Sequence, residues 1–189
     1  MRAFIAADPD ETSRAALHRL IGRLSRRFGN QSVKWVDPAQ LHATVAFLGD
    51  VPDGHADVIA DIVRAAASDT KPFTVIAAGL GAFPSDAAPR VLWAGVTDGA
   101  AELGAVSDRI WSSLERIGWS REARPYHAHV TLGRCRFPID SKHWHEECAR
   151  AARTMEWCQW TVSSLQLYRS ILTPAGPRYE VLCAGAFAV

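Results

Sequence analysis

Segments with the two-residue period of a β-strand are gathered in groups along this chain of 189 residues, and only a few helical stretches separate them. Strands are expected at residues 2–7, 33–36, 41–48, 73–78, 91–96, 128–134, 157–168 and 178–187. Helices are expected over about 9–28, 53–67, 99–117 and 141–153. Because a strict βαβ alternation is missing, the pattern predicts an α+β fold with mainly antiparallel sheets.

The connections between these segments carry clear turn signals. The prolines and glycine of residues 173–177 predict a tight hairpin between the last two strands. A longer loop, with room to border a site, is expected between residues 78 and 91, where the chain contains Gly79, Gly81, Pro84 and Pro89. With 48% hydrophobic residues, the chain suits a single domain over residues 1–189, built as two closely packed lobes.

The amino-acid composition argues against duplex DNA and membranes as binding partners. The 21 basic and 20 acidic residues leave a formal charge of +1, which is unlike the broad basic surface of a tight duplex-DNA binder. A small anionic group requires only a local cluster of positive charge. No apolar run approaches the roughly 20 residues that span a bilayer, and the apolar start is too short for a secretory signal. We therefore expect a soluble, cytoplasmic monomer with no membrane contact and no obligate protein partner.

Neither the cysteines nor the histidine-rich segment near residue 145 predicts a metal site. The four cysteines are scattered without a CxxC pair, which favours small buried hydrophobic residues over a zinc knuckle or a disulfide framework. His143 and His145 are two residues apart on an expected helix and do not share a face, unlike the i, i+4 spacing of a helical zinc site. We expect an ordinary solvated helix there, and no cofactor.

The first of two repeated motifs lies in residues 41–49, where an alternating strand contains His-x-Thr and ends in glycine. The strand period of two puts His42, Thr44 and Ala46 on one face. Phe47 is expected on the opposite, apolar face. A polar pair that faces away from an apolar row is available for chemistry.

The second motif, in residues 128–134, repeats this arrangement with His129 and Thr131 on one face beside Gly133. Either triplet alone is best explained as a structural histidine beside a threonine that favours strands. Two triplets in such a composition are unusual, and both lie in apolar alternating strands that run into a glycine. The larger repeated unit favours a shared function.

Two such pairs suit the hydrolysis of a cyclic phosphate. The reaction removes a proton from the attacking water and supplies one to the departing sugar oxygen, and histidine can do either near neutral pH. The threonine hydroxyls are suited to hold the non-bridging phosphate oxygens. A bell-shaped pH dependence follows, no metal is needed, and the residues themselves do not say which histidine is the acid.

The two His-x-Thr strands resemble the signature of the 2H phosphoesterase family, in particular its RNA 2',3'-cyclic phosphodiesterases, first named 2'-5' RNA ligases. Other segments that resemble this group are residues 36–38, 47–49, 91–93, 167–170 and 176–179. The resemblance covers nearly the whole chain. It implies two pseudo-symmetric α+β lobes whose sheets face a central cleft, with one motif on each side and the helices outside.

The resemblance also implies roles for the residues. It makes His42 the proton donor and His129 the proton acceptor in a hydrolysis that yields a 2'-phosphomonoester. The family commonly has proline before the second histidine, whereas this chain has Ala128, which puts the local backbone rigidity in doubt. His127 faces the same side as His129 but has no threonine partner, so it is a weaker candidate catalyst.

Positive and aromatic side chains extend the candidate site. Arg134 follows Thr131 by three residues and resembles the arginine that often closes the second motif, where a guanidinium is suited to bind phosphate. Tyr126 and Trp93 are candidates for stacking on a base. Further positive charge that could attract an RNA backbone is present at Arg121, Arg124, Arg136, Arg169 and Arg178.

Several functions remain open at this level, with RNA ends or small cyclic phosphates as the expected substrates. Another 2H activity would cleave a small cyclic nucleotide or ADP-ribose cyclic phosphate, or seal 2'-5' RNA joints. A non-catalytic RNA-binding module would use the same histidines for contact alone. A histidine-based metalloenzyme would lose its activity to a chelator.

Overall fold

The computed structural model describes residues 1–52, 54–121, 123–153, 157–174 and 176–188. Its strands are β1 (Arg2–Ala7), β2 (Val33–Trp35), β3 (Ala43–Asp50), β4 (Phe73–Ser85), β5 (Ala88–Val96), β6 (His129–Cys135), β7 (Cys158–Val162), β8 (Ser164–Thr173) and β9 (Gly176–Ala186). Its helices are α1 (Glu11–Phe28), α2 (Ala56–Ser68), α3 (Ala100–Glu115) and α4 (Ser141–Ala151), with a 3₁₀ turn η1 at Pro38–Gln40. The predicted α+β class is confirmed.

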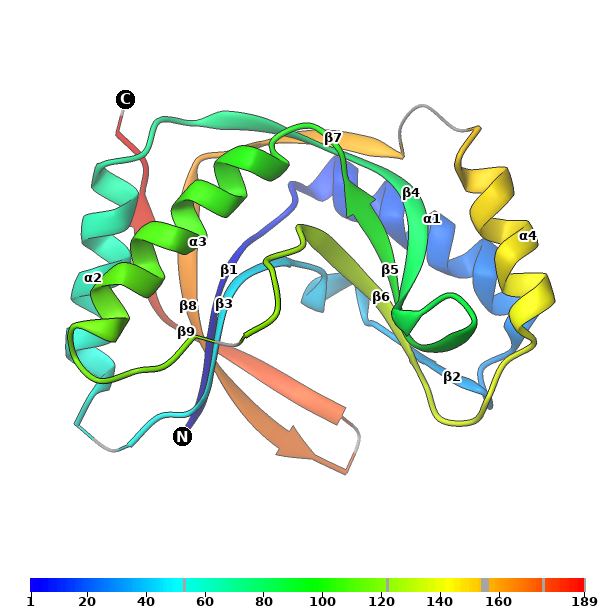
Figure 1. The fold of residues 1–189 in the computed structure, drawn as a ribbon, viewed down its shortest axis with the longest axis horizontal. Coiled ribbons are helices and arrows are strands. Elements are labelled where there is room, and N and C mark those ends of the chain that lie inside the picture. Colours follow the sequence, from blue (N-terminus) through cyan, green and yellow to red (C-terminus); the bar gives the residue numbers. More distant parts are fainter. Residues whose placement is uncertain (53, 122, 154–156, 175, 189) are drawn as a thin grey trace.

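The strands form one curled sheet in the order β7-β4-β5-β6-β3-β1-β8-β9, with β2 paired to β6, and each pairing is antiparallel. Helices α2 and α3 cover the half built from β3, β1, β8 and β9, whereas α1 and α4 cover the other half (Figure 1). The sheets expected to face each other are therefore joined, where β3 meets β6. The concave face of the sheet lies between the two halves.

Helix α1 shows how the core is assembled. Asp10 caps its first turn, since the carboxylate accepts a hydrogen bond from the Ser13 amide at 2.7 Å. Leu17, Leu20 and Leu24 recur at helical spacing and are at most 4% exposed. Burying side chains of this size contributes roughly 1.5–3 kcal/mol each, which holds α1 against the sheet.

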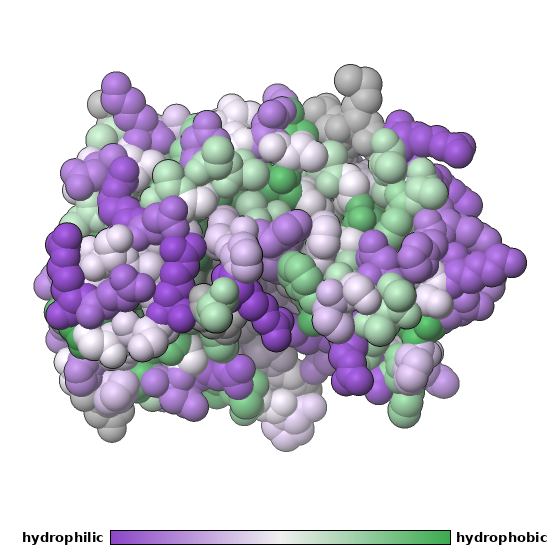
Figure 2. All heavy atoms as spheres, in the orientation of Figure 1, coloured by the Kyte–Doolittle hydropathy of each residue, from purple (hydrophilic) through white to green (hydrophobic). Residues whose placement is uncertain are grey.

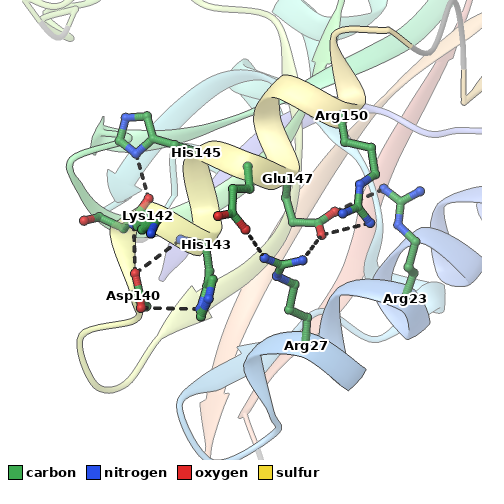
Figure 3. A network of polar contacts seen from close by, with 10 residues as sticks. Arg23, Arg27, Asp140, Lys142, His143, His145, Glu147 and Arg150 are labelled. Atoms are coloured by element: carbon green, nitrogen blue, oxygen red, sulfur yellow. Dashed lines mark hydrogen bonds and ion pairs between the residues drawn. The ribbon is translucent and has the colours of Figure 1, made fainter.

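Helix α4 is joined to the rest of the molecule through one buried face. Trp144 is fully buried, and its indole N–H donates to the Asp86 carboxylate at 2.9 Å. The Glu147 side chain is 3% exposed, and the arginines around it come from α1 and from α4 itself (Figure 3). These are Arg23, Arg27 and Arg150. The acidic residue is therefore a structural ion-pair partner.

The histidines of α4 point away from this face. His143 and His145 are exposed, and their Nδ1 atoms lie 3.3 Å from the Asp140 carboxylate and 2.7 Å from the Ser141 carbonyl, respectively (Figure 3). In the described part of the chain, no group of three or more His, Cys, Asp or Glu side chains could hold a metal ion. The helix is thus solvated on one face and packed on the other.

The prediction of a long loop between residues 78 and 91 is wrong. β4 continues to Ser85 and pairs with β5 as far as Ser85 opposite Ala88, so a tight hairpin replaces the loop. Gly79 has φ of 68° and lies where the register shifts, which marks a bulge rather than a chain break. The pair Pro84 and Pro89 lies near the end of the ladder, where missing N–H donors cost little.

The strand expected over residues 157–168 is also corrected. It divides at Ser163 into β7, which pairs with β4, and β8, which lies between β1 and β9. The predicted hairpin between the last two strands is confirmed as β8 and β9. Asp53, expected at a helix start, and Ala175, expected in the hairpin turn, lie outside the described residues. Among the helices of the described ranges, none is long and apolar enough to cross a membrane.

Candidate active site

The two motifs meet where β3 and β6 pair across the middle of the sheet. Ala43 pairs with Val130, and both side chains are fully buried. Residues one step away on either strand point to the other face of an antiparallel pair. Because the pairing is antiparallel, Thr44 follows the bridge on the side from which His129 enters it, and His42 precedes the bridge on the side where Thr131 leaves it. The pair of Ala43 and Val130 therefore lies at the point where the two motifs meet.

Each histidine is anchored in the same way. Nδ1 of His42 lies 2.7 Å from the Gln40 carbonyl, and Nδ1 of His129 lies 2.7 Å from the His127 carbonyl, so each ring contacts the residue two positions earlier. A carbonyl oxygen can only accept, so Nδ1 carries a proton in both rings. The Nε2 atom of each ring is therefore the one that can gain or lose a proton during catalysis.

Burial lowers the pKa of His42 below the ordinary 6.5, since a charged imidazole loses hydration there. The hydrogen bond to Gln40 and the negative charge of Asp8 oppose this effect, whereas the positive charges of Arg134 and Arg14 add to it. Asp8 directly follows β1, whose last pair is Ala7 opposite Ala43, so the register carries Asp8 to the neighbourhood of His42.

Burial likewise lowers the pKa of His129. The hydrogen bond to the His127 carbonyl raises it, and the charges of the His127 ring, His42 and Arg134 lower it. The charge of His42 thus acts on His129, and Arg134 acts on both histidines. Strands far apart in sequence therefore converge on one site.

An aromatic wall holds each imidazole. The Phe4 ring stacks on His42 with 4.7 Å between centroids, and Tyr179 meets the same ring edge-on at 5.5 Å. On the other side of the site, Phe83 meets His129 edge-on at 5.0 Å. These contacts restrict the tilt of both rings, which general acid–base catalysis requires because proton transfer depends on geometry.

A cavity of about 340 Å³ opens beside the motifs, and the molecular surface is indented between the two halves of the sheet (Figure 2). Thr44, His129, Thr131 and Arg134 line it together. The Tyr126 hydroxyl donates a hydrogen bond to the Thr44 carbonyl at 3.1 Å, which joins two residues of the cavity wall. The cavity thus brings His129 together with both motif threonines and a guanidinium, whereas His42 is not among the residues that line it.

The other candidate residues are distributed unequally. Four of them line the cavity, namely His127, Arg121, Arg124 and Tyr126. Arg121 also forms an ion pair with Asp108. Arg136 lines a second cavity, and Arg169 and Arg178 form ion pairs with Glu180. Trp93 packs 4.7 Å from the His127 ring. The residues that sequence reasoning missed are Phe4, Asp8, Phe83, Tyr168 and Tyr179.

These missed residues lie on strands that are remote in sequence from the motifs, or, for Asp8, directly after one. Tyr168 lies on β8 and donates a hydrogen bond to the Asp8 carboxylate at 2.6 Å, and its ring stacks on Phe4 at 5.1 Å. The family resemblance of residues 167–170 and 176–179 was the one signal that pointed to this region.

Comparison with known proteins identifies the family. The sequence profile of the family described as "LigT like Phosphoesterase" matches residues 8–93 and 95–179. The chain belongs to this family. LigT-like phosphoesterases are 2H phosphoesterases, so the resemblance that the motifs carry is confirmed.

Curated relatives of this LigT-like phosphoesterase match nearly the whole chain. A protein of Archaeoglobus fulgidus named RNA 2',3'-cyclic phosphodiesterase is 33% identical over 185 residues, which cover 96% of this chain and 98% of the relative. A protein of Methanothermobacter thermautotrophicus with the same name is 33% identical over 179 residues, 95% of either chain.

Solved structures agree with the fold. The TT0787 protein of Thermus thermophilus superposes with a TM-score of 0.80 at 27% identity and covers 99% of this chain and 98% of its own. Escherichia coli LigT complexed with 3'-AMP has a TM-score of 0.75 at 22% identity and covers 98% of this chain and 97% of its own. The second likeness establishes the LigT-like fold alone.

Proposed function

We propose that this phosphoesterase hydrolyses the 2',3'-cyclic phosphate ends of RNA to 2'-phosphomonoesters. The crosswise meeting of two His-x-Thr pairs around the bridge of Ala43 and Val130 carries the proposal. It supplies two imidazoles whose Nε2 atoms are free for proton transfer and two hydroxyls on the same face. The names of the curated relatives support the same substrate class.

In the proposed reaction, His129 removes a proton from water as its oxygen attacks phosphorus. The bond between phosphorus and the 3'-oxygen breaks, His42 donates a proton to that oxygen, and the phosphate remains on the 2'-oxygen. Thr44 and Thr131 donate hydrogen bonds to the non-bridging oxygens, and Arg134 balances their charge. One histidine must be neutral and the other protonated at the start of each turnover.

The assignment of the donor role to His42 has electrostatic support. Asp8 raises the pKa of His42, whereas a second histidine ring, His127, lowers the pKa of His129. A nearby carboxylate stabilises the protonated imidazole, and a nearby imidazole disfavours it. Asp8 thus favours the protonated form of His42, against the opposing effects of burial, Arg134 and Arg14 on its pKa.

The test uses an RNA oligonucleotide that ends in 2',3'-cyclic phosphate. The assay separates products that carry a 2'-phosphate from products that carry a 3'-phosphate. His42→Ala and His129→Ala are each expected to lower kcat by about 10²–10⁴-fold, the usual contribution of a general acid or base. His145→Ala is the matched control, because its Nδ1 also donates to a carbonyl but the ring lies on the exposed face of α4. Turnover by both site variants at the wild-type rate would refute the proposal.

Three further measurements separate the competing functions. Opening of ADP-ribose 1'',2''-cyclic phosphate with no action on RNA ends would assign another 2H substrate. Binding of RNA without any turnover would assign a non-catalytic module. Activity is expected to survive EDTA, and its loss with recovery on adding a metal would favour a metalloenzyme.

A further inference from the structure

A second cavity lies at the C-terminal end of β6. It has a volume of about 320 Å³ and lies between the turn that joins β4 to β5 and the segment that leads into α4 (Figure 1). Arg90 and Arg136 line it together with Phe137. Its volume falls in the range of small-molecule sites, and the proposed reaction does not use it.

The two arginines of this second cavity are not neutralised by the protein. In the described part of the chain, neither Arg90 nor Arg136 has an ion pair or a side-chain hydrogen bond, and both are exposed. The carboxylates nearest to them in sequence are engaged elsewhere. Asp86 accepts a hydrogen bond from the Trp144 indole, and Asp140 caps the start of α4. The second cavity therefore carries a local positive charge in a chain whose formal charge is only +1.

Phe137 gives the second cavity an aromatic surface. It is 64% exposed, although residues of this type are usually buried. Its amide donates a hydrogen bond to the Ser32 carbonyl at 3.3 Å, so the backbone is held while the ring stays open to solvent. An open aromatic ring beside positive charge is the combination with which proteins bind single-stranded nucleic acid.

The strand register connects the second cavity with the active site. Arg134 lines the catalytic cavity and Arg136 lines the second one, and the Arg136 amide continues the ladder by donating to the Ser32 carbonyl at 2.7 Å. Residues two apart on a strand point to the same side and lie about 7 Å apart. On β5, Val91 pairs with Arg134 and lines the first cavity, and the preceding Arg90 lines the second. The two cavities are therefore neighbours along one ladder.

We propose that the second cavity binds the RNA nucleotides on the 5' side of the cyclic phosphate end, with Phe137 stacked on a base and Arg90 and Arg136 paired with phosphates. The inference rests on the proposed function for the position of the cyclic phosphate beside Arg134. The remainder of an RNA chain has to leave the active site, and the neighbouring cavity offers it both positive charge and an open ring. Stacking and phosphate contacts tolerate any base, so the preference is for longer RNA ends and not for a sequence.

Equilibrium binding of product-like RNA provides the test, because it does not depend on turnover. An RNA hexanucleotide that ends in 2'-phosphate and adenosine 2'-monophosphate are each titrated by calorimetry into wild type, Phe137→Ala and Phe137→Trp. Wild type is expected to bind the hexanucleotide about tenfold more tightly than the mononucleotide. Phe137→Ala should raise the Kd for the hexanucleotide about tenfold and leave the Kd for the mononucleotide unchanged, whereas Phe137→Trp should retain wild-type affinity for both.

The salt dependence of Kd separates stacking from phosphate pairing. On a single strand, each phosphate contact contributes about 0.7 to the slope of log Kd against log salt concentration. Arg90→Ala and Arg136→Ala should each lower that slope for the hexanucleotide by about this amount, whereas Phe137→Ala should leave the slope unchanged.

Val58→Ala and Arg116→Ala are the matched controls, on α2 and at the end of α3 in the other half of the molecule. Both side chains are exposed, and neither change should alter affinity or slope. Equal wild-type affinity for the two ligands, unchanged hexanucleotide affinity in Phe137→Ala, or an unchanged slope in both arginine variants would overturn the inference. A wild-type protein that binds the hexanucleotide through Phe137 but opens no cyclic phosphate would refute the proposed function and leave this inference standing.

Discussion

Gly81 lies on β4 beneath the indole ring of Trp93, and a methyl group at this position would come within 3.0 Å of three ring atoms. Carbon atoms in good contact are about 3.5–4.0 Å apart, so Gly81→Ala forces the ring to withdraw. Phe83 at 5.4 Å and His127 at 4.7 Å flank that ring, which leaves it little room. Overpacking of this kind costs about 1–3 kcal/mol, and we expect the upper half of that range.

For a chain of this length, the free-energy loss corresponds to a fall in Tm of roughly 4–12 °C. Activity should fall as well, because the Trp93 ring lies 6.1 Å from the His129 ring. A displacement of about 1 Å at a reacting group can cost on the order of 10²-fold in rate, so kcat/KM is expected to drop by about 10- to 100-fold.

Thermal unfolding and steady-state hydrolysis of a 2',3'-cyclic phosphate measure the two effects. Gly22→Ala, on α1, is the control, because nothing is nearer to the added methyl than the Arg26 guanidinium at 3.9 Å. It should stabilise the helix by about 0.5–1 kcal/mol. In a Trp93→Leu background, Gly81→Ala should lose most of its effect, since the two changes share one contact. Wild-type Tm and kcat/KM in Gly81→Ala would refute the packing argument.

Three further predictions concern the site and the core. Because burial lowers the pKa of both His42 and His129 below 6.5, the profile of kcat/KM against pH should be bell-shaped with its maximum below pH 6.5, and activity should fall at higher pH as the proton donor is deprotonated. A maximum above about pH 7.5 would contradict this. Thr44→Val and Thr131→Val should each lower kcat by about 10²-fold through loss of an oxyanion donor, with unchanged Tm. Glu147→Gln should reduce the free energy of unfolding by about 1.5–3 kcal/mol and leave kcat/KM unchanged, as denaturant titration and the same assay would show.

Local periodicity was sufficient to predict which side chains of the second motif share a face. His129 and Thr131 alternate with buried Val130 and Leu132, as a period of two requires. The class of fold followed from the same kind of pattern, since grouped strands with few helices favour antiparallel pairing. These features depend on neighbours in sequence, which is why the amino-acid order alone determines them.

The pairing partners of the strands required the tertiary structure. The bridge between Ala43 and Val130 joins residues that are far apart along the chain, and no local pattern specifies it. The same holds for Phe4 and Tyr179, which reach His42 from β1 and β9. Long-range hydrogen bonding and packing decide such contacts, so the identity of the aromatic walls could not be predicted.

The β-bulges show where local sequence patterns stop predicting the direction of a side chain. Phe47 has the sequence position of a core residue, yet the bulges of β3 turn it toward the cavity, and Gly79 has the sequence signal of a loop but bends a continuous strand. One extra residue reverses every later side chain relative to the partner strand. The sequence by itself determined the reacting groups and their local faces, whereas only the folded sheet decided what surrounds them, because the register is set by hydrogen bonds between distant strands.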